Sequence, residues 1–455
     1  MSYKIIDLQY INNTSKLFNF FSDKEYSVLF DSSISTKFPN TRFDIIAANP
    51  YKVINNIQDI KKNLEITHIP KNNKYDIPFY PGAIGYFSYE SNHESFNITN
   101  NKQNDFELPD VTICFYGFAI INDHKKKSCF LIYDINKIKK YYNSSHESYI
   151  NNIINNINNN LNNNLNNNLN NNNQISQKNN KFIPNVSFAQ YKKQFDIIKE
   201  LITQGDCYQI NLTQRFELKN FNFNENYTPW NLFIDLKKNN PAPYSSFFKL
   251  NNNTSIISLS PEKFIEINNN KIITKPIKGT IAKNLDPKID QENINKLLNS
   301  KKDFAENTMI TDLLRNDLNI CSEIGSVKVE KLCALESYPA VHHLVSTVSG
   351  IKKHDLHPFD IFKNCFPGGS ITGAPKKRAM EIINKTETKK RNIYCGSIAY
   401  FSQDGNMDSN ITIRTLLQKD NNLYLWSGGG IVIKSELQSE YNEVFSKISK
   451  IIEIV

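Results

Sequence analysis

The sequence contains no long hydrophobic run. A helix that crosses a membrane needs about 20 consecutive, mostly apolar residues, and no stretch of the 455 residues approaches that length. The first twenty residues mix polar and apolar side chains and lack the apolar centre of a secretory signal. We therefore expect no membrane association and a cytoplasmic location.

Cysteine and phosphate-binding patterns are missing as well. The seven cysteines are an odd number and none belongs to a Cys-x-x-Cys motif, which excludes the usual zinc cages and dithiol redox sites and favours free thiols in a reducing compartment. Gly368 and Gly373 have the spacing of a Walker A loop, but Ala374 and Pro375 stand where that loop needs Lys and then Ser or Thr. Nucleotide binding is therefore not indicated.

Positive charge is present without being clustered. The 54 Lys and Arg exceed the 45 Asp and Glu, giving a net charge of +9, yet the longest basic run is Lys125–Lys127. This scatter argues against nucleic acid as a partner. A net positive surface still favours the approach of a small anionic substrate.

An asparagine-rich segment divides the chain. Residues 151–183 are dominated by Asn-Asn-Asn-Leu repeats, in which Leu161, Leu165 and Leu169 recur every four residues. That spacing could support a weak helix, but Asn is a poor helix former, so we predict a mobile low-complexity insert. It separates an amino-terminal part, 1–150, from a carboxyl-terminal part, 184–455.

The carboxyl-terminal part alternates strand and helix patterns. Ser187 can cap a helix that ends at Gly205, with apolar residues at helical spacing from Phe188 to Ile202. Strand-like runs lie at 210–216, 255–259, 264–267, 271–277, 396–401, 409–417 and 423–426, and helices are expected around 290–317, 358–364, 375–385 and 436–453. Grouped strands with interspersed helices predict an α+β fold with large antiparallel sheets.

A series of motifs follows in fixed order. They are Gly205–Asn211, Ser260–Glu262, Thr274–Thr280, Ala305–Asn307 with Asp312–Asp317, Val341–Ser346, Phe366–Lys376, Thr412–Thr415, Ser427–Gly430 and Glu440–Glu443. This set resembles the chorismate-utilising enzymes, closely over about 184–455 and more loosely over the first 130 or so residues. The resemblance implies a sandwich of two large antiparallel sheets with helices outside, to which the amino-terminal part contributes strands.

Lys278 decides which branch of that family the chain resembles. A partly desolvated lysine loses proton affinity and becomes a nucleophile near neutral pH, although a lysine taken alone is usually solvated surface. A lysine here resembles the aminodeoxychorismate synthase component I branch, whereas the anthranilate synthase component I branch is expected to carry a small residue. The resemblance implies a covalent bond from Lys278 to chorismate, amination to 4-amino-4-deoxychorismate, and a role in p-aminobenzoate and folate biosynthesis.

Two further residues complete the expected catalytic set. Glu262 is assigned as a general acid or base beside the lysine, a role that requires burial to raise its pKa. His343 is assigned to the site and His342 to the structure, since neighbouring residues on a strand point to opposite faces. A surface turn for Glu262 and a hydrogen-bonded core imidazole for His343 remain the alternatives.

Chorismate carries two carboxylates, so its site needs cations and free N–H groups. The Ser370–Pro375 turn leads into a helix, an arrangement that suits anions, and Arg414, expected in the middle of a strand, can grip a carboxylate with two parallel hydrogen bonds or form a structural salt bridge. The resemblance assigns substrate contacts to Asn211, Gly279, Thr280, Thr372, Tyr400, Arg414, Gly429 and Gly430.

Two acid pairs are candidates for a metal site. Asp303 and Glu306, like Glu440 and Glu443, are three residues apart on expected helices, which places each pair on one helix face. Such pairs usually belong to solvated surface. The resemblance implies that Glu306 and Glu443 bind Mg²⁺, with Asp303 and Glu440 acting through water.

The resemblance also implies partners and a second ligand. No Cys lies in a Gly-x-Cys-x-Gly elbow, so ammonia is expected from a separate glutamine amidotransferase subunit, in a heterodimer. Ser32, Pro243 and Tyr244 match a tryptophan pocket, but Asn40-Thr41 stands where an aromatic residue is expected before Arg42.

Three other functions remain open from the sequence. Anthranilate synthase component I shares most of the motifs and ranks second, and isochorismate or salicylate synthase ranks third. A non-catalytic binding protein that acts through the Asn tract is the alternative from another class. Deleting 151–180 and assaying turnover would separate that class from the enzymes.

Overall fold

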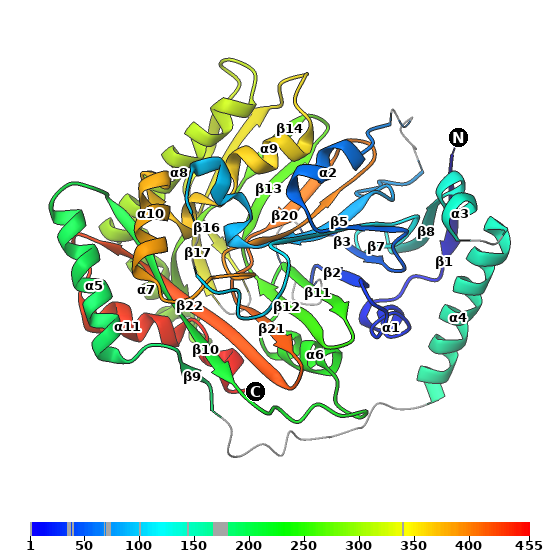
Figure 1. The fold of residues 1–455 in the computed structure, drawn as a ribbon, viewed down its shortest axis with the longest axis horizontal. Helices are drawn as coiled ribbons and strands as arrows, with labels where there is room; N and C mark the ends of the chain where they lie inside the picture. The colour runs from blue at the N-terminus through cyan, green and yellow to red at the C-terminus, as the bar shows by residue number, and fades with distance from the viewer. Residues whose placement is uncertain are drawn as a thin grey trace.

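Two large antiparallel β-sheets organise the chain in the computed structural model (Figure 1). The structure describes residues 2–33, 38, 41–67, 69, 74–99, 102–142, 145–166, 181–338 and 341–455. The expected α+β fold built on two large antiparallel sheets is confirmed.

The first sheet runs from the amino-terminal strand β1 at one edge to the short strand β18 at the other, and β9 (Ile183–Pro184) pairs with its strand β10. Its order is β1 (Tyr3–Leu8), β8 (Ser128–Asp134), β7 (Phe118–Asp123), β3 (Phe43–Ala47), β2 (Val28–Asp31), β11 (Tyr244–Asn251), β12 (Thr254–Ser260), β21 (Thr415–Lys419), β22 (Asn422–Val432), β10 (Gln209–Leu218) and β18 (Gly373–Ala374).

The second sheet faces the first, and β16 (Lys328–Ser337) pairs with its strand β17. Its order is β15 (Ile277–Ala282), β17 (Val341–Ile351), β14 (Lys271–Thr274), β13 (Lys263–Asn268), β20 (Met407–Asn410), β19 (Ser397–Phe401), β5 (Ala83–Phe87), β6 (Val111–Phe115) and β4 (Lys52–Ile54). Phe30 of the first sheet and Tyr400 of the second lie 6.0 Å apart between ring centroids.

Helices lie around these sheets, and Figure 1 shows α5 and α11 alongside β22 and β10. They are α1 (Ser15–Phe18), α2 (Ile57–Asn63), the 3₁₀ helix η2 (Tyr89–Phe96), α3 (Ile135–Tyr141), α4 (His146–Asn166), α5 (Phe188–Thr203), α6 (Pro229–Asn239), α7 (Pro287–Leu298), α8 (Lys301–Cys321), α9 (Pro358–Cys365), the 3₁₀ turn η3 (Gly369–Ile371), α10 (Lys376–Thr386), α11 (Leu437–Ser446) and α12 (Ser449–Ile452).

Both halves of the chain build both sheets. Strand β2 pairs with β11 in the first sheet, and β5 pairs with β19 in the second. Because each pairing joins an amino-terminal strand to a carboxyl-terminal one, one buried hydrophobic cluster runs through residues of both halves. The site therefore rests on a single core.

Two expected strands are interrupted. The run 271–277 breaks at Lys275 and Pro276, since proline has no N–H to donate to a ladder. The run 409–417 breaks between β20 and β21, where the chain leaves the second sheet and enters the first. We had predicted that Arg414 lies in the middle of a strand. It lies instead in this crossover, with a φ of 50°.

The first part of the asparagine-rich segment, residues 151–166, is helical. Helix α4 extends to Asn166, and Ile150, Ile153 and Ile157 are buried at 1%, 5% and 2% exposure. These isoleucines recur at helical spacing, so packing against the core overrides the poor helix propensity of asparagine. The mobility of this insert stays a prediction; residues 167–180, with Leu169, lie outside the described residues.

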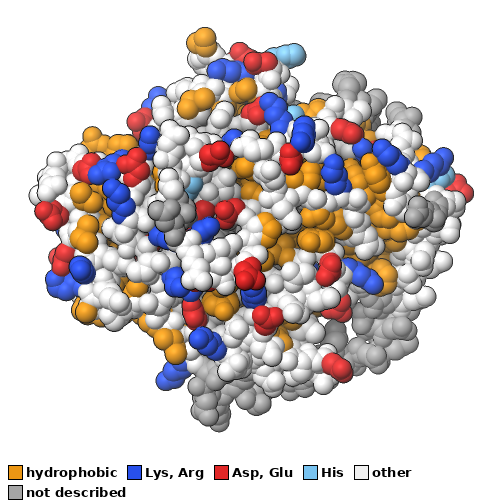
Figure 2. Space-filling model, viewed as in Figure 1, with side chains coloured by type: hydrophobic (Ala, Val, Ile, Leu, Met, Phe, Trp, Pro, Cys, Tyr) orange, Lys and Arg blue, Asp and Glu red, His pale blue; other side chains and the backbone are white. Residues whose placement is uncertain are grey.

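The surface carries mixed charge. Figure 2 shows Lys and Arg side chains interspersed with Asp and Glu over the visible face. In the described part of the chain, every helix is too short or too polar to cross a membrane.

Candidate active site

Lys278 lies on β15, and its amine is turned toward the 3₁₀ turn η3 (Gly369–Ile371). Its Nζ donates a hydrogen bond to the backbone oxygen of Ser370, 3.1 Å away. The side chain is half-buried, and desolvation lowers the pKa of its ammonium group; Lys447 lowers it further, while Glu306 and Glu262 oppose the shift. The shift moves the amine toward its neutral, nucleophilic form.

Glu262 lies directly before β13 and is 5% exposed. Its backbone N–H donates to the Ser260 hydroxyl, 3.2 Å away. Burial raises the pKa of its carboxyl to about 7, against the opposing effects of the Ser370 hydroxyl and the Lys278 ammonium. A carboxyl with this pKa can give or take a proton near neutral pH.

His343 and Thr280 are joined on neighbouring strands. The Thr280 hydroxyl and His343 Nδ1 lie 2.7 Å apart, and the imidazole is 3% exposed. Burial lowers the pKa of His343 to about 3, with the Arg414 charge adding to the effect. The imidazole is therefore neutral at pH 7. His342 points the other way, to Ser337 and Asp290.

Arg414 is a cation without a carboxylate partner. Among the residues that the structure describes, no hydrogen bond or ion pair is recorded for its guanidinium group, and burial lowers its pKa. A buried charge is costly unless it is paired. The structural salt bridge considered above is not formed, and the vacancy suits a substrate carboxylate.

Four acidic side chains from α8 and α11 surround the Lys278 end of the site. Glu306 Oε1 is buried with no hydrogen-bond partner among the described residues, and its nearest cation is Lys302, 3.9 Å away. Lys302 also lies 3.3 Å from Glu440, which is 2% exposed. A Cβ on Gly429 would lie 3.2 Å from Glu440 Oε2 and 3.6 Å from Glu443 Oε1.

These carboxylates fit a magnesium ion as donors. Within the described ranges no three acidic, His or Cys side chains converge into a ready-made metal cage. Mg²⁺, however, keeps several waters and needs only one or two protein carboxylates. Burial raises the pKa of Glu306, with Lys278 and Lys302 opposing, so an unpartnered carboxylate oxygen there would gain from a divalent cation.

Among the other predicted substrate residues, Asn211 and Gly430 lie on β10 and β22, Thr372 follows η3, and Gly279 lies on β15. Asn211 is 7% exposed with an unpartnered Oδ1, and its backbone N–H donates to the Thr372 oxygen, 2.9 Å away. Gly430 pairs with Asn211, and a side chain on it would strike Gln209. Gly279 has a φ of +82° and packs against Asp303. The Thr372 hydroxyl donates to the Gly368 oxygen.

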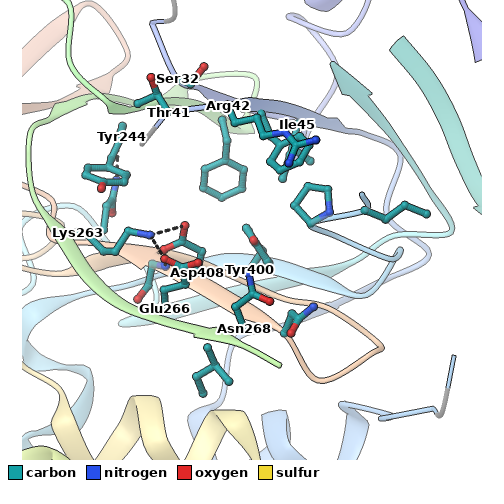
Figure 3. A pocket seen from close by; sticks show the side chains of 18 of the residues that line it. Ser32, Thr41, Arg42, Ile45, Tyr244, Lys263, Glu266, Asn268, Tyr400 and Asp408 are labelled. Atoms are coloured by element: carbon teal, nitrogen blue, oxygen red, sulfur yellow. Dashed lines mark hydrogen bonds and ion pairs between the residues drawn. The ribbon is translucent and has the colours of Figure 1, made fainter. Parts of the chain in front are cut away.

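Tyr400 lines a cavity that does not include Lys278 or Arg414. This cavity of about 690 Å³ lies between the sheets and is lined by Tyr400 together with Ser32, Pro243 and Tyr244, the predicted tryptophan residues. Figure 3 shows Lys263 on its wall, with ion pairs to Glu266 and to Asp408, the latter at 3.2 Å.

Two lysines at the site, Lys447 and Lys302, were missed from the sequence, and Ser370 was identified only as part of the anion-binding turn. Lys447 donates to the Gly428 oxygen at 3.0 Å and lies 2.6 Å from Glu443. Lys302 joins Glu306 and Glu440, and Ser370 lies beside Glu262. The i,i+4 spacing of Glu443 with Lys447, and of Lys302 with Glu306, was a usable signal.

A half-buried lysine, a carboxyl with a pKa of about 7, an arginine with no partner among the described residues and the carboxylates of α8 and α11 belong to one two-sheet scaffold. The chain is similar in fold to the crystal structure of anthranilate synthase component I from Streptococcus pneumoniae TIGR4, with a TM-score of 0.76, 29% identity, and coverage of 90% of this chain and 92% of that one.

The family follows from the sequence comparison. The model of the chorismate binding enzyme family matches residues 15–453, and the chain belongs to that family. It is 36% identical to "Aminodeoxychorismate synthase component 1" of Escherichia coli K12 over 436 residues, which cover 91% of this chain and 90% of that protein. It is also 33% identical to "Anthranilate synthase component 1" of Acetivibrio thermocellus, with coverage of 90% and 81%.

Proposed function

We propose that the protein converts chorismate and ammonia into 4-amino-4-deoxychorismate. The observation that carries the proposal is the desolvated Lys278 amine in the same site as Glu262, whose pKa is raised to about 7. The Escherichia coli relative named "Aminodeoxychorismate synthase component 1" aligns over nine-tenths of both chains and supports the proposal.

The site residues account for the two anionic groups of the substrate. Arg414 lacks a protein partner and would grip one carboxylate, and the N–H groups of the Ser370–Gly373 turn would face the other. Mg²⁺, held by Glu306 and Glu443 with Asp303 and Glu440 through water, would neutralise carboxylate charge when bound. Thr280 and neutral His343, which are joined by a hydrogen bond, would help to orient the substrate.

The proposed chemistry proceeds in two substitutions. The neutral Lys278 amine bonds to C2 of the ring as the C4 hydroxyl leaves, and Glu262 gives that hydroxyl its proton, so that water departs. Ammonia then bonds to C4 while the bond from C2 to Lys278 breaks, and the ammonia nitrogen gives a proton to the Glu262 carboxylate, which restores the acid. The sum is chorismate plus ammonia giving 4-amino-4-deoxychorismate plus water.

One assay tests the function. Purified protein is incubated with chorismate, ammonium and Mg²⁺, and the product is identified by mass. We expect the amino-deoxy product with its enolpyruvyl group retained. Fluorescent anthranilate with release of pyruvate would instead establish the second candidate, anthranilate synthase component I, which is favoured by the names of two similar proteins.

Ammonia is proposed to come from a second subunit. The relatives' name, component 1, supports a two-component enzyme, and we assign the partner as a glutamine amidotransferase that forms a heterodimer with this chain in the cytoplasm. The product would feed p-aminobenzoate and folate synthesis. If the purified chain used glutamine as well as it uses ammonium, this partner would be unnecessary.

Replacing Glu306 by Gln should weaken the response to Mg²⁺. The Mg²⁺ concentration for half-maximal activity is expected to rise about 10-fold to 100-fold, a range seen when metal-site groups are altered, because a buried carboxylate oxygen is lost. Asp312→Asn removes an exposed carboxylate from the same helix and is the control. An unchanged Mg²⁺ response in Glu306→Gln would remove Glu306 from the metal site.

The second cavity is proposed to bind L-tryptophan. Ser32, Pro243 and Tyr244 line it, and carboxylates on its wall could hold an ammonium group. Calorimetric titration with L-tryptophan should give one binding site per chain. In Ser32→Ala the affinity for L-tryptophan should fall at least 10-fold, because a hydroxyl that contacts the ligand is lost. Absence of heat, with protein shown by mass to be free of tryptophan, would reject the assignment.

A further inference from the structure

Arg391 is a buried cation that contacts the Gly369–Thr372 loop. The proposed reaction chemistry does not use its charge. Arg391 follows α10 and is 1% exposed. Its Nη1 donates to the backbone oxygen of Ile371, 2.8 Å away, and its Nη2 donates to the backbone oxygen of Asn211, 2.7 Å away. One planar group thus holds the carbonyls of two separate substrate-binding segments.

Glu387 neutralises this charge and adds a third attachment. Its carboxylate accepts from Arg391 Nη2 at 2.6 Å and from Nε at 2.9 Å, which is the two-bond geometry of a strong ion pair. The same carboxylate accepts from the Thr213 N–H at 3.0 Å and the Thr213 hydroxyl at 2.9 Å. Strand β10 is therefore held at two positions, Asn211 and Thr213.

The amino-terminal half fixes Arg391 from the other side. The Glu90 carboxylate accepts from the backbone N–H groups of Arg391 and Asn392, at 2.8 and 3.0 Å. The Tyr89 ring lies 4.5 Å from the centre of the guanidinium group. Helix η2 thereby determines where the guanidinium fork sits, although it contributes no group to the site.

The held segments carry the reacting groups. The Ser370 oxygen accepts the hydrogen bond from Lys278, and the Asn211 N–H donates to the Thr372 oxygen. The carbonyls that Arg391 holds belong to the residue after Ser370 and to Asn211 itself. Moving either segment would displace the partner of Lys278, and a displacement of about 1 Å can cost about 100-fold in rate.

We propose that the Arg391–Glu387 pair is a positioning device that registers the Gly369–Thr372 loop against β10, so that Lys278 meets the substrate in reacting geometry. The proposal rests on the proposed function for its kinetic consequence alone. Only a fork with several fixed donors can serve Ile371, Asn211 and Glu387 at once, so lysine, with one nitrogen, cannot replace it.

The test compares Arg391→Lys with a milder change and a matched control. Thr213→Val removes the hydroxyl anchor of Glu387 and keeps shape, so it remains informative if Arg391→Lys fails to fold. Arg215→Lys is the control, because Arg215 is also a buried arginine, paired to Asp105 at 2.8 Å, and lies on the same strand. All are assayed with chorismate, ammonium and Mg²⁺, and by hydrogen exchange.

We expect kcat to fall about 100-fold in Arg391→Lys and about 10-fold in Thr213→Val, with KM for chorismate within about 3-fold, since positioning acts on the transition state. Amides of 369–373 should exchange at least 10-fold faster, and those of β2 and β11 should not. Arg215→Lys should leave both readouts unchanged.

Two outcomes would overturn the proposal. One is a folded Arg391→Lys or Thr213→Val protein with wild-type kcat and wild-type exchange at 369–373. The other is equal acceleration of exchange in all strands, which would mean that the pair only stabilises the fold. If the wild type turns over no chorismate, the proposed function fails, but local exchange at 369–373 still decides whether the pair holds the loop.

Discussion

Replacing Lys278 by alanine is expected to lower formation of 4-amino-4-deoxychorismate by about 10³-fold or more. Losses of this order accompany removal of a covalent nucleophile. Desolvation and Lys447 lower the pKa of Lys278, and its Nζ lies 3.1 Å from the Ser370 oxygen, so the amine is held inside the site and not in bulk water. Chorismate binding should change less than turnover, because Arg414 and the carboxylates remain.

The matched control for this variant is Lys275→Ala. Lys275 lies three residues away in the sequence and pairs with Glu336 at 3.4 Å, outside the reacting cluster, so its loss should cost less than about 3-fold. Mass analysis of peptides from wild-type protein incubated with chorismate and Mg²⁺ without ammonia should show a ring adduct on Lys278. Full activity of Lys278→Ala would end the covalent mechanism.

The pH dependence of the Lys278 step follows from the direction of its shift. A lowered pKa means that the amine becomes neutral at a lower pH than a free lysine would. The rate of adduct formation should therefore rise with pH and level off below the pH at which ordinary lysines titrate. Single-turnover trapping across pH measures this limb apart from ammonia addition.

Much of the fold was predictable because its signals are local. Ser187 caps α5 as expected and also forms a capping box with Gln190, and strand runs such as 210–216 and 255–259 lie within β10 and β12. What could not be predicted depends on tertiary packing. The crossover at Arg414 exists because the chain changes sheets there, and α4 persists because Ile150, Ile153 and Ile157 find a core.

The site was predictable only where residue type limits the chemistry. Lysine, glutamate and arginine at Lys278, Glu262 and Arg414 were identified from motifs, and the structure places them on β15, before β13 and in the β20–β21 crossover. Arg391 and Glu387 gave no such signal. Their partners are backbone carbonyls and Thr213, which are distant in sequence.

Glu262 and Lys263 are adjacent in the sequence but belong to different sites. Glu262 lies beside Lys278, while Lys263, next in the chain, lines the cavity with Tyr244 and Tyr400. Alternation of side chains along an extended chain accounts for this division. Tyr400, assigned to substrate from the sequence, lines the same cavity as Lys263.

Replacing Glu262 by glutamine is expected to reduce kcat about 10²-fold to 10⁴-fold, the range for loss of a general acid or base. Glutamine keeps the size of the side chain but cannot give a proton to the departing C4 hydroxyl. With a pKa of about 7, the wild-type carboxyl is about nine-tenths protonated at pH 6 and about one-tenth at pH 8. Wild-type kcat should therefore fall as pH rises through 7.

The measurement is kcat against pH for wild type, Glu262→Gln and Glu266→Gln, with ammonia concentration held constant as free base. Glu266 lies on the same strand but lines the second cavity, so its variant should retain the wild-type profile. Glu262→Gln should lose the decline near pH 7, because the group that titrates there is gone. A decline that persists in Glu262→Gln would assign the proton to another group, and wild-type kcat in that variant would remove Glu262 from the mechanism.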